Sequence, residues 1–374
     1  MLEERLRARI ARAGRITFAE FMAIALYDPD AGFYAHPPVG PGRDYVTSPH
    51  VSAAFGVLLA RQLTEAWDLL GRPEPFAVVE LGAGDGTLAL QLLEALSPPL
   101  DAVVRYVGVE PGAGGREVMR GRGLCAVPRV EEAGAGLVGL VIANEVLDNV
   151  PFHLLRRAGE RLVERYVELG HEGLRLADGP VSSPDLERLA PPLRPGEEAP
   201  VSPLALDLVD RAAATLRRGY LVLVDYAGRG RRAPVHAYRG GRVDDDVLSE
   251  PGSRDITAAV DLRGIVEHAR RRGLRAWGPV TQRRALLALG IHELEEQARQ
   301  RQTRSLAGGR GLEALRIFSN RSRLRLLVDP AGLGAHRALC LGVGVTRPLR
   351  LVRRDPPPGP IPRREPSPGR SGPQ

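Results

Sequence analysis

The sequence contains no lysine, so all 52 of its strongly basic residues are arginines. Aromatic residues are also scarce, at 5% of the chain, and arginine is spread along the whole length. A nucleic-acid site needs basic residues clustered on one face and aromatic rings on which bases stack. We therefore expect no nucleic-acid partner despite the net charge of +7. The residue usage is typical of a GC-rich genome.

Cysteine and long apolar runs are lacking too. The two cysteines, Cys125 and Cys340, lie far apart and provide neither a disulfide framework nor a zinc site. The eight histidines show no metal-ligand spacing, so we expect no metal. No apolar run approaches the length of a membrane-spanning helix, and the first residues lack the apolar core of a signal peptide. These features favour a cytoplasmic protein without a membrane span.

One stretch organises the rest of the chain. Residues 77–88 read Ala-Val-Val-Glu-Leu-Gly-Ala-Gly-Asp-Gly-Thr-Leu, an apolar strand that ends near Glu80 and turns through glycines into a helix. Gly82, Gly84 and Gly86 allow a sharp turn and a close approach of the backbone to a ligand. The helix that follows presents unpaired N–H groups. The pattern predicts a nucleotide-type cofactor site at the carboxyl end of a parallel strand.

The glycine spacing separates two classes of cofactor. In the dinucleotide fingerprint the third glycine comes five positions after the first, but here Thr87 occupies that position. The pattern Glu-x-Gly-x-Gly-x-Gly instead resembles motif I of S-adenosylmethionine-dependent methyltransferases. A second strand, 103–109, ends in Glu110, whose carboxylate is suited to the two ribose hydroxyls. A solvated strand end is the alternative for Glu110, and Glu80 either orients the loop or contacts the ammonium of the cofactor.

The order of elements predicts an α/β protein. Residues 1–70 form an N-terminal helical cap and cofactor lid, with a capping box at Thr17 and Glu20. From residue 71 to 352, strands and helices alternate as in a doubly wound, mostly parallel, Rossmann-like sheet. Substrate-side insertions are expected at about 155–200 and 228–300, a helix is expected to begin within 254–261, and 353–374 is predicted to be a disordered tail. Further expected strands are 137–143, 219–226 and 338–345, and further expected helices are 203–217, 282–289 and 311–328.

Polar residues follow the strand 137–143. Glu145 and Asp148 lie three positions apart, so on a helical turn they would face the same way. Two such carboxylates can hold a guanidinium group by paired hydrogen bonds. Arginine does not deprotonate in water, so an arginine acceptor requires acidic partners. The alternative is a helix cap at Asp148 beside a solvated Glu145; Asn144, at the strand end, is assigned to the cofactor.

Five motifs in this order resemble the MidA family of methyltransferases, over roughly residues 15–345. They are Asp-Tyr-Val-Thr-Ser-Pro at 44–49 with Phe-Gly at 55–56, the glycine stretch at 79–88, and the segments 144–151, 224–226 and 251–257. The resemblance implies a class I methyltransferase sheet and S-adenosyl-L-methionine as cofactor. It also implies methylation of an arginine in a protein, because mitochondrial members dimethylate a subunit of respiratory complex I. The resemblance implies that Asp44, Thr47 and Ser48 form a lid over the cofactor, and a simple capped turn before the next helix is the alternative. We count Asp44 as catalytic with Glu145 and Asp148, and Thr47 and Ser48 as cofactor contacts.

The acceptor is less determined than the cofactor. His50 replaces a glutamate of the family motif, and Tyr238-Arg239 is followed by Gly240-Gly241-Arg242 where the family often has histidines. A small-molecule O- or N-methyltransferase is therefore an open alternative, as is a non-catalytic assembly factor that keeps the cofactor fold. A nicotinamide-dependent dehydrogenase is disfavoured by the glycine spacing. The oligomeric state is open, a homodimer included.

Overall fold

The computed structural model describes residues 2–35, 47–171, 173–228, 235–239 and 242–353. The predicted catalytic residue Asp44 lies outside these ranges. The predicted tail lies outside them from residue 354 onward.

A seven-stranded sheet forms the centre of the molecule. The strand order is β14 (Arg275–Thr281), β15 (Arg337–Val343), β10 (Leu216–Asp225), β5 (Leu137–Asn144), β2 (Phe76–Leu81), β3 (Val104–Val109) and β4 (Ala126–Val127). The five strands from β10 to β4 are parallel, and β15 runs antiparallel to both of its neighbours. The chain winds outward from β2 through β3 to β4 and then returns to β5 on the other side. This reversal is a topological switch point, where ligands bind in such sheets, and it confirms the predicted doubly wound, mostly parallel fold.

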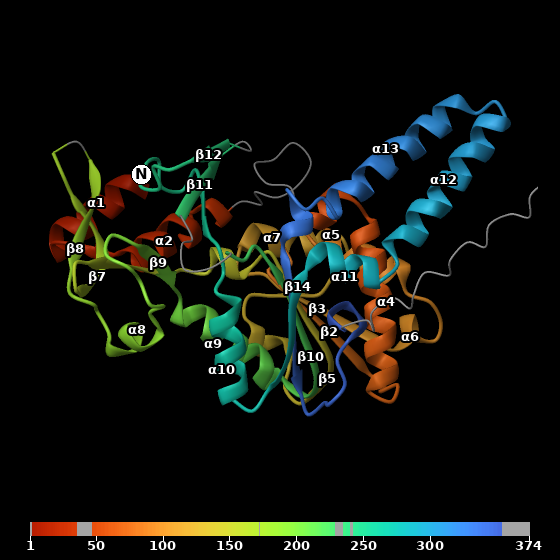
Figure 1. Cartoon of the computed structure of the whole chain (residues 1–374), viewed down its shortest axis with the longest axis horizontal. Coiled ribbons are helices and arrows are strands. Elements are labelled where there is room, and N and C mark those ends of the chain that lie inside the picture. The colour runs from red at the N-terminus through yellow and green to blue at the C-terminus, as the bar shows by residue number, and fades with distance from the viewer. Residues whose placement is uncertain (1, 36–46, 172, 229–234, 240–241, 354–374) are drawn as a thin grey trace, which may run out of the picture.

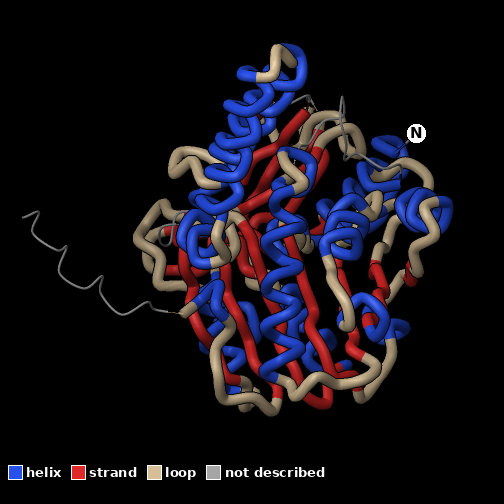
Figure 2. Tube along the Cα trace, turned by 90° about the vertical axis from the view of Figure 1, so that its right-hand side faces the viewer, coloured by secondary structure: helices blue, strands red, loops and turns tan. Residues whose placement is uncertain are grey.

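Helices cover both faces of this sheet (Figure 2). Val78 belongs to the core on one face, with α4 (Ala54–Leu69), α5 (Thr87–Ala95) and α11 (Gln282–Ala288). Val79 belongs to the core on the other face, with α9 (Pro203–Thr215) and α10 (Leu262–Arg271). All six residues of β2 are buried, as expected for a parallel strand covered on both faces. The continuous apolar runs of the sequence therefore become two-sided core strands.

A second body, beside the central sheet, joins the N-terminus to the segment after β5 (Figure 1). It contains α1 (Leu2–Ala13), α2 (Phe18–Tyr27) and a five-stranded antiparallel sheet: β1 (Ile16–Thr17), β6 (His153–Ala158), β7 (Arg161–Leu169), β8 (Leu174–Gly179) and β9 (Glu198–Val201). The predicted capping box is confirmed, because Thr17 Oγ1 accepts from Glu20 N and Glu20 Oε2 accepts from Thr17 N, each at 3.1 Å. Phe18 and Phe152 pack with ring centroids 5.5 Å apart. The N-terminal helices thus share a core with residues far along the chain.

A three-stranded sheet replaces the helix expected within 254–261. It consists of β11 (Val235–Arg239), β12 (Arg242–Asp244) and β13 (Asp255–Ala258), so that prediction is wrong. β13 pairs antiparallel with β11, and this distant pairing outweighs the local helical signal. The helix α10 begins only at Leu262, capped by Asp261. β14 and α10 lie within the range 228–300 that was predicted as the second insertion, yet β14 belongs to the central sheet and α10 packs against it. The predicted division of the chain into domains stays a prediction.

Two antiparallel helices, α12 (Ile291–Ala307) and α13 (Gly311–Leu327), form a hairpin that projects from the body (Figure 1). The inner end of α13 contacts the short helix α3 (Ser48–Val51). The sequence predicts α13 within one residue of its end but does not predict the hairpin. The contact with α3 connects the hairpin to a predicted lid residue, Ser48.

Candidate active site

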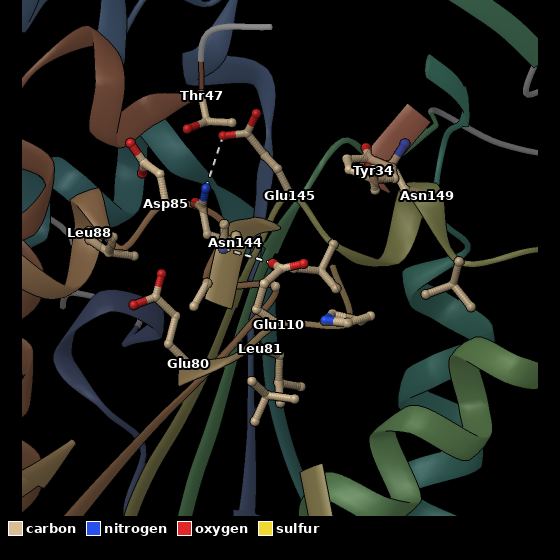
Figure 3. A pocket seen from close by; sticks show the side chains of 18 of the residues that line it. Tyr34, Thr47, Glu80, Leu81, Asp85, Leu88, Glu110, Asn144, Glu145 and Asn149 are labelled. Atoms are coloured by element: carbon tan, nitrogen blue, oxygen red, sulfur yellow. Dashed lines mark hydrogen bonds between the residues drawn. The ribbon is translucent and has the colours of Figure 1, made fainter. Parts of the chain in front are cut away.

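A cavity of about 340 Å³ opens at the carboxyl ends of β2, β3 and β5 (Figure 3). Its volume lies within the range of sites for small molecules and cofactors. Seven of the predicted site residues line it: Thr47, Glu80, Gly82, Gly84, Glu110, Asn144 and Glu145. These residues come from four separate segments of the chain, and the fold brings them together. Gly86, Ser48 and Asp148 do not line the cavity itself.

The three glycines of the loop have different physical roles. All three have left-handed backbones, with φ of +61° at Gly82, +56° at Gly84 and +78° at Gly86. A Cβ at Gly82 would lie 2.7 Å from Val146 Cγ2, and one at Gly86 would lie 2.5 Å from Leu124 Cδ1, so packing alone demands these two glycines. A Cβ at Gly84 would meet nothing nearer than the Gly82 carbonyl oxygen at 4.0 Å. Gly84 is therefore the position left bare toward the cavity, as a cofactor cradle requires.

Glu110 connects this loop to the end of β3. Its Oε2 accepts from Gly84 N at 2.9 Å, and its Oε1 accepts from Gly112 N at 2.7 Å. Burial raises the pKa of Glu110 despite these two bonds. Each carboxylate oxygen has a second acceptor site, and Glu110 lines the cavity. The geometry fits a diol such as the ribose hydroxyls.

Glu80 is a buried carboxylate in the wall of the cavity. It is 4% exposed, and its Oε2 accepts from Tyr106 Oη at 2.7 Å. Burial raises the pKa of Glu80 to about 8, because the hydrogen bond from Tyr106 compensates only part of the lost hydration. A cation placed beside this carboxyl would favour its ionised form. The site therefore fits the ammonium of an amino-acid moiety.

Thr47, His50 and Asp85 form a polar group at one wall of the cavity. Thr47 Oγ1 lies 2.8 Å from His50 Nδ1, and His50 Nε2 lies 3.5 Å from Asp85 Oδ1. Burial acts to raise the pKa of Asp85, but hydrogen bonds with His50 and Thr87 outweigh it and hold the pKa at about 2. The sequence did not assign His50 or Asp85 to the site. The sequence did contain one signal that could have pointed to His50, because this histidine replaces a glutamate of the family motif.

Glu145 has an unusual backbone and an incompletely bonded side chain. Its φ is +56°, a left-handed conformation that is rare for a residue with a side chain. Glu145 Oε1 accepts from Ser48 N at 3.1 Å and from Asn144 Nδ2 at 3.0 Å. Glu145 Oε2 is buried and has no hydrogen-bond partner within the described ranges. Glu145 precedes a 3₁₀ turn, η3 (Leu147–Asn149), that contains Asp148, so the two residues do not share one regular helical turn.

Asp148 lies in a buried group of carboxylates, which we call the acidic cluster: Glu145, Asp148, Asp225 and Asp255. Asp148 is 3% exposed, and its Oδ1 has no partner among the residues that the structure describes. Burial, followed by the charges of Asp225, Asp255 and Glu145, raises the pKa of Asp148 well above its usual value. The charge of Glu145 therefore acts on Asp148, although no helix aligns the two residues.

Asp225 and Asp255 hold the turn that carries Asp148. Asp225 Oδ2 accepts from Val146 N at 3.1 Å and from Leu147 N at 2.8 Å. Asp255 Oδ1 accepts from Asn149 Nδ2 at 2.8 Å and from Tyr34 Oη at 3.0 Å. Burial raises the pKa of each of these two aspartates to about 7. Asp255 lies in the segment 254–261, where the sequence predicted the start of a helix with Asp255 or Thr257 as its cap, and only its place in the motif 251–257 pointed to a site.

An aromatic pair and a glutamine complete the surroundings. Tyr27 and Tyr34 stack with ring centroids 5.4 Å apart, and both line the cavity. Gln282 Nε2 donates to Ser48 Oγ at 3.2 Å and to Leu327 O at 3.0 Å. Gln282 therefore joins the inner end of the hairpin to the residue whose backbone N–H holds Glu145. No motif or spacing in the sequence assigned Gln282 to the site.

The fold and the cavity together define a class of protein. Strands β4-β3-β2-β5-β10 are parallel, with β15 inserted antiparallel before β14, and the cavity lies at the switch point. A bare glycine at 84 and a carboxylate after the second parallel strand line this cavity, without the glycine spacing of dinucleotide sites. This is the arrangement of a class I methyltransferase. The site has the carboxylates for both the ribose and the amino-acid end of S-adenosyl-L-methionine.

Comparisons with known proteins lead to the family. The model of a family of S-adenosyl-L-methionine-dependent methyltransferases matches residues 58–280, and the chain belongs to this family. The mitochondrial protein arginine methyltransferase NDUFAF7 homolog of Drosophila melanogaster is 29% identical, over 89% of this chain and 82% of that protein. The Xenopus tropicalis protein arginine methyltransferase NDUFAF7 is 29% identical, over 76% of this chain and 74% of that protein.

Solved structures agree with this assignment. A crystal structure from Burkholderia thailandensis, bound to S-adenosyl-homocysteine, has a TM-score of 0.82 and 27% identity and covers 94% of each chain. A native structure from the same organism has a TM-score of 0.78 at the same identity and coverage. The protein is thus an S-adenosyl-L-methionine-dependent methyltransferase, and the resemblance found in the sequence is confirmed.

Proposed function

We propose that this enzyme methylates arginine side chains of a protein. The observation that carries the proposal is a pair of buried carboxylate oxygens without partners in the described parts of the chain, Glu145 Oε2 and Asp148 Oδ1. A guanidinium group presents five N–H donors in a rigid planar fork that matches carboxylate oxygens. The names of the Drosophila and Xenopus relatives, which are protein arginine methyltransferases, support the same acceptor.

The charge of the acidic cluster favours a cationic acceptor over a neutral one. Repulsion from Asp225, Asp255 and Glu145 adds to burial in raising the pKa of Asp148. A bound guanidinium would relieve this repulsion, whereas a neutral hydroxyl or amine would not. The stacked pair Tyr27 and Tyr34 offers a flat aromatic wall on which a guanidinium can also rest. Recognition by charge and by planar shape therefore point to the same chemical group.

The side chains have distinct roles in this proposal. The bound cofactor supplies an electrophilic methyl group. Glu145, fixed by Ser48 N and Asn144 Nδ2, orients the acceptor and keeps its positive charge away from the attacking nitrogen. One proton must leave that nitrogen when the new C–N bond has formed. Asp148 does not line the cavity, so the proton passes through Glu145, which does, to Asp148 in the acidic cluster; a carboxylate with a raised pKa is a stronger base than an exposed one.

The test uses methyl-labelled S-adenosyl-L-methionine and a protein extract. After incubation with the enzyme, the protein fraction is hydrolysed and its labelled amino acids are separated by chromatography. Labelled methylarginine is expected with the wild type and is expected to be absent with Asp148→Asn, provided that this variant still binds the cofactor. Label in methyllysine, or only in the protein-free fraction, would contradict the proposal. The second outcome would favour a small-molecule acceptor.

A further inference from the structure

The outer end of the α12–α13 hairpin carries large apolar side chains that face solvent. Leu306, Leu312, Leu315 and Phe318 are between 53% and 79% exposed. Each helix has 17 residues, so each is about 25 Å long. Figure 1 and Figure 2 both show the hairpin projecting away from the rest of the chain. A flat surface can therefore reach its end without meeting the catalytic body.

The hairpin does not need these side chains for its own packing. The residues buried from the middle of the hairpin outward are small: Ala298 and Ser305 on α12, and Ala314 on α13. Small residues let the two helices approach closely and leave the larger leucines and Phe318 outside the seam. Four large apolar groups gathered at one exposed end are more than scattered surface residues, and such patches mark interaction sites.

Charge is sorted along the hairpin. The inner part of α12 carries Glu293, Glu295 and Glu296, which pair with Arg61, Arg325 and Arg299, respectively. The outer segment 301–318 contains four arginines, at positions 301, 304, 310 and 316, and one acidic residue, Glu313, which pairs with Arg310. Four positive charges less one negative charge leave this segment at +3. The apolar side chains and the excess positive charge therefore lie at the same end.

We propose that the outer end of this hairpin binds the surface of an anionic lipid bilayer. Leu306, Leu312, Leu315 and Phe318 enter the boundary between headgroups and acyl chains, while the arginines face lipid phosphates. If two copies associated through this end, two segments of net charge +3 would face each other, and their repulsion would oppose the association. None of the described helices is long and apolar enough to cross a membrane, so the contact is a surface one. It brings methyl transfer close to a membrane without anchoring the chain in it.

The test is flotation of the purified full-length chain with vesicles. One set contains phosphatidylcholine and phosphatidylglycerol at 70:30, and the other contains phosphatidylcholine alone. We expect co-flotation with the anionic set only, weakened by 0.5 M salt. The double variant Leu312→Ser/Leu315→Ser should bind at least tenfold more weakly, and Arg304→Gln about fivefold more weakly. Leu326→Ser is the matched control, because Leu326 is 51% exposed on the same helix but lies at its inner end.

Three results would overturn the proposal. The first is a wild type that stays unbound with both sets of vesicles. The second is equal binding by the double variant and the Leu326→Ser control. The third is a concentration-dependent dimer in analytical ultracentrifugation that the double variant abolishes, which would assign the surface to a second copy. Because the substituted side chains are exposed, unchanged melting temperatures should verify that every variant folds.

Discussion

Replacing Asp148 by asparagine removes one carboxylate from the acidic cluster and nearly preserves its shape. We expect the variant to be inactive and yet more stable than the wild type. Activity should fall because the acceptor loses a charged partner and the proton loses its base; removal of one preorganised group typically costs at least about a hundredfold in kcat. Stability should rise because a buried, repelled charge disappears.

The direction of the stability effect follows from the neighbouring carboxyls. The pKa of Asp255 is raised from 3.8 to about 7, which corresponds to about 4 kcal/mol lost from the free energy of unfolding once both states are ionised. The folded state binds more protons than the unfolded state in this window, so stability falls as pH rises from about 4 to 7. The pKa of Asp148 is raised in the same direction. Asparagine still costs hydration but carries no charge, so we expect the free energy of unfolding of Asp148→Asn to exceed that of the wild type at pH 8.

The assay is thermal unfolding from pH 4 to pH 8, together with methyl transfer at pH 8. The gain in the free energy of unfolding should raise the melting temperature at pH 8, and for a chain of this length about 1 kcal/mol corresponds to about 1–2 °C. The gain should shrink toward pH 4, where the unfolded chain also becomes protonated. Asp101→Asn, on an exposed residue, is the control and should change neither quantity.

Three outcomes would refute this reasoning. A lower melting temperature for Asp148→Asn at pH 8 would mean that a partner stabilises the carboxylate, so that it is not repelled by its neighbours. An active variant would remove Asp148 from acceptor binding and proton transfer. A gain that does not depend on pH would show that the effect is one of packing and not of charge.

Three further predictions concern the cofactor and the lid. Gly84→Val should abolish binding of S-adenosyl-L-methionine in calorimetry. Gly123→Val is the control: Gly123 has φ of +78° and no atom near the position of a side chain's first carbon, so this variant should keep binding despite similar backbone strain. Equal loss of binding in both variants would refute the role of Gly84 in holding the cofactor. Because the pKa of Glu80 is about 8, its ionised fraction rises from pH 7 to pH 9, so the affinity of the wild type relative to Glu80→Gln should rise about tenfold; a flat ratio would refute an ionic contact. Gln282→Leu should lower kcat about tenfold while cofactor affinity stays unchanged, because Ser48 loses its tie to the hairpin; an unchanged kcat would show that the tie has no catalytic role.

The local signals in the sequence were reliable wherever short-range physics decides the structure. The capping box at Thr17 needs only four residues, and the apolar strand before Gly82 needs only burial on both faces. The glycine spacing distinguished one cofactor class from another because backbone approach is a local property. The acidic residue after the strand 103–109 and the family motif 144–151 pointed correctly to Glu110 and Glu145, respectively, as residues at the cavity.

Only the tertiary structure decided which of these residues meet, and why. The sequence predicted the same role for all three glycines of the loop. In the structure, Val146 and Leu124 occupy the space where a side chain at Gly82 or Gly86 would lie, and only Gly84 has open space there. Asp255 became a strand residue bonded to Tyr34, 221 positions away, since pairing with β11 outweighed a helical pattern. The pKa of Asp148 depends on the charges of Asp225 and Asp255 from two distant segments, which no local pattern encodes. Sequence determined the strand, turn and cofactor class because these depend on neighbours along the chain; the acceptor site depends on neighbours in space.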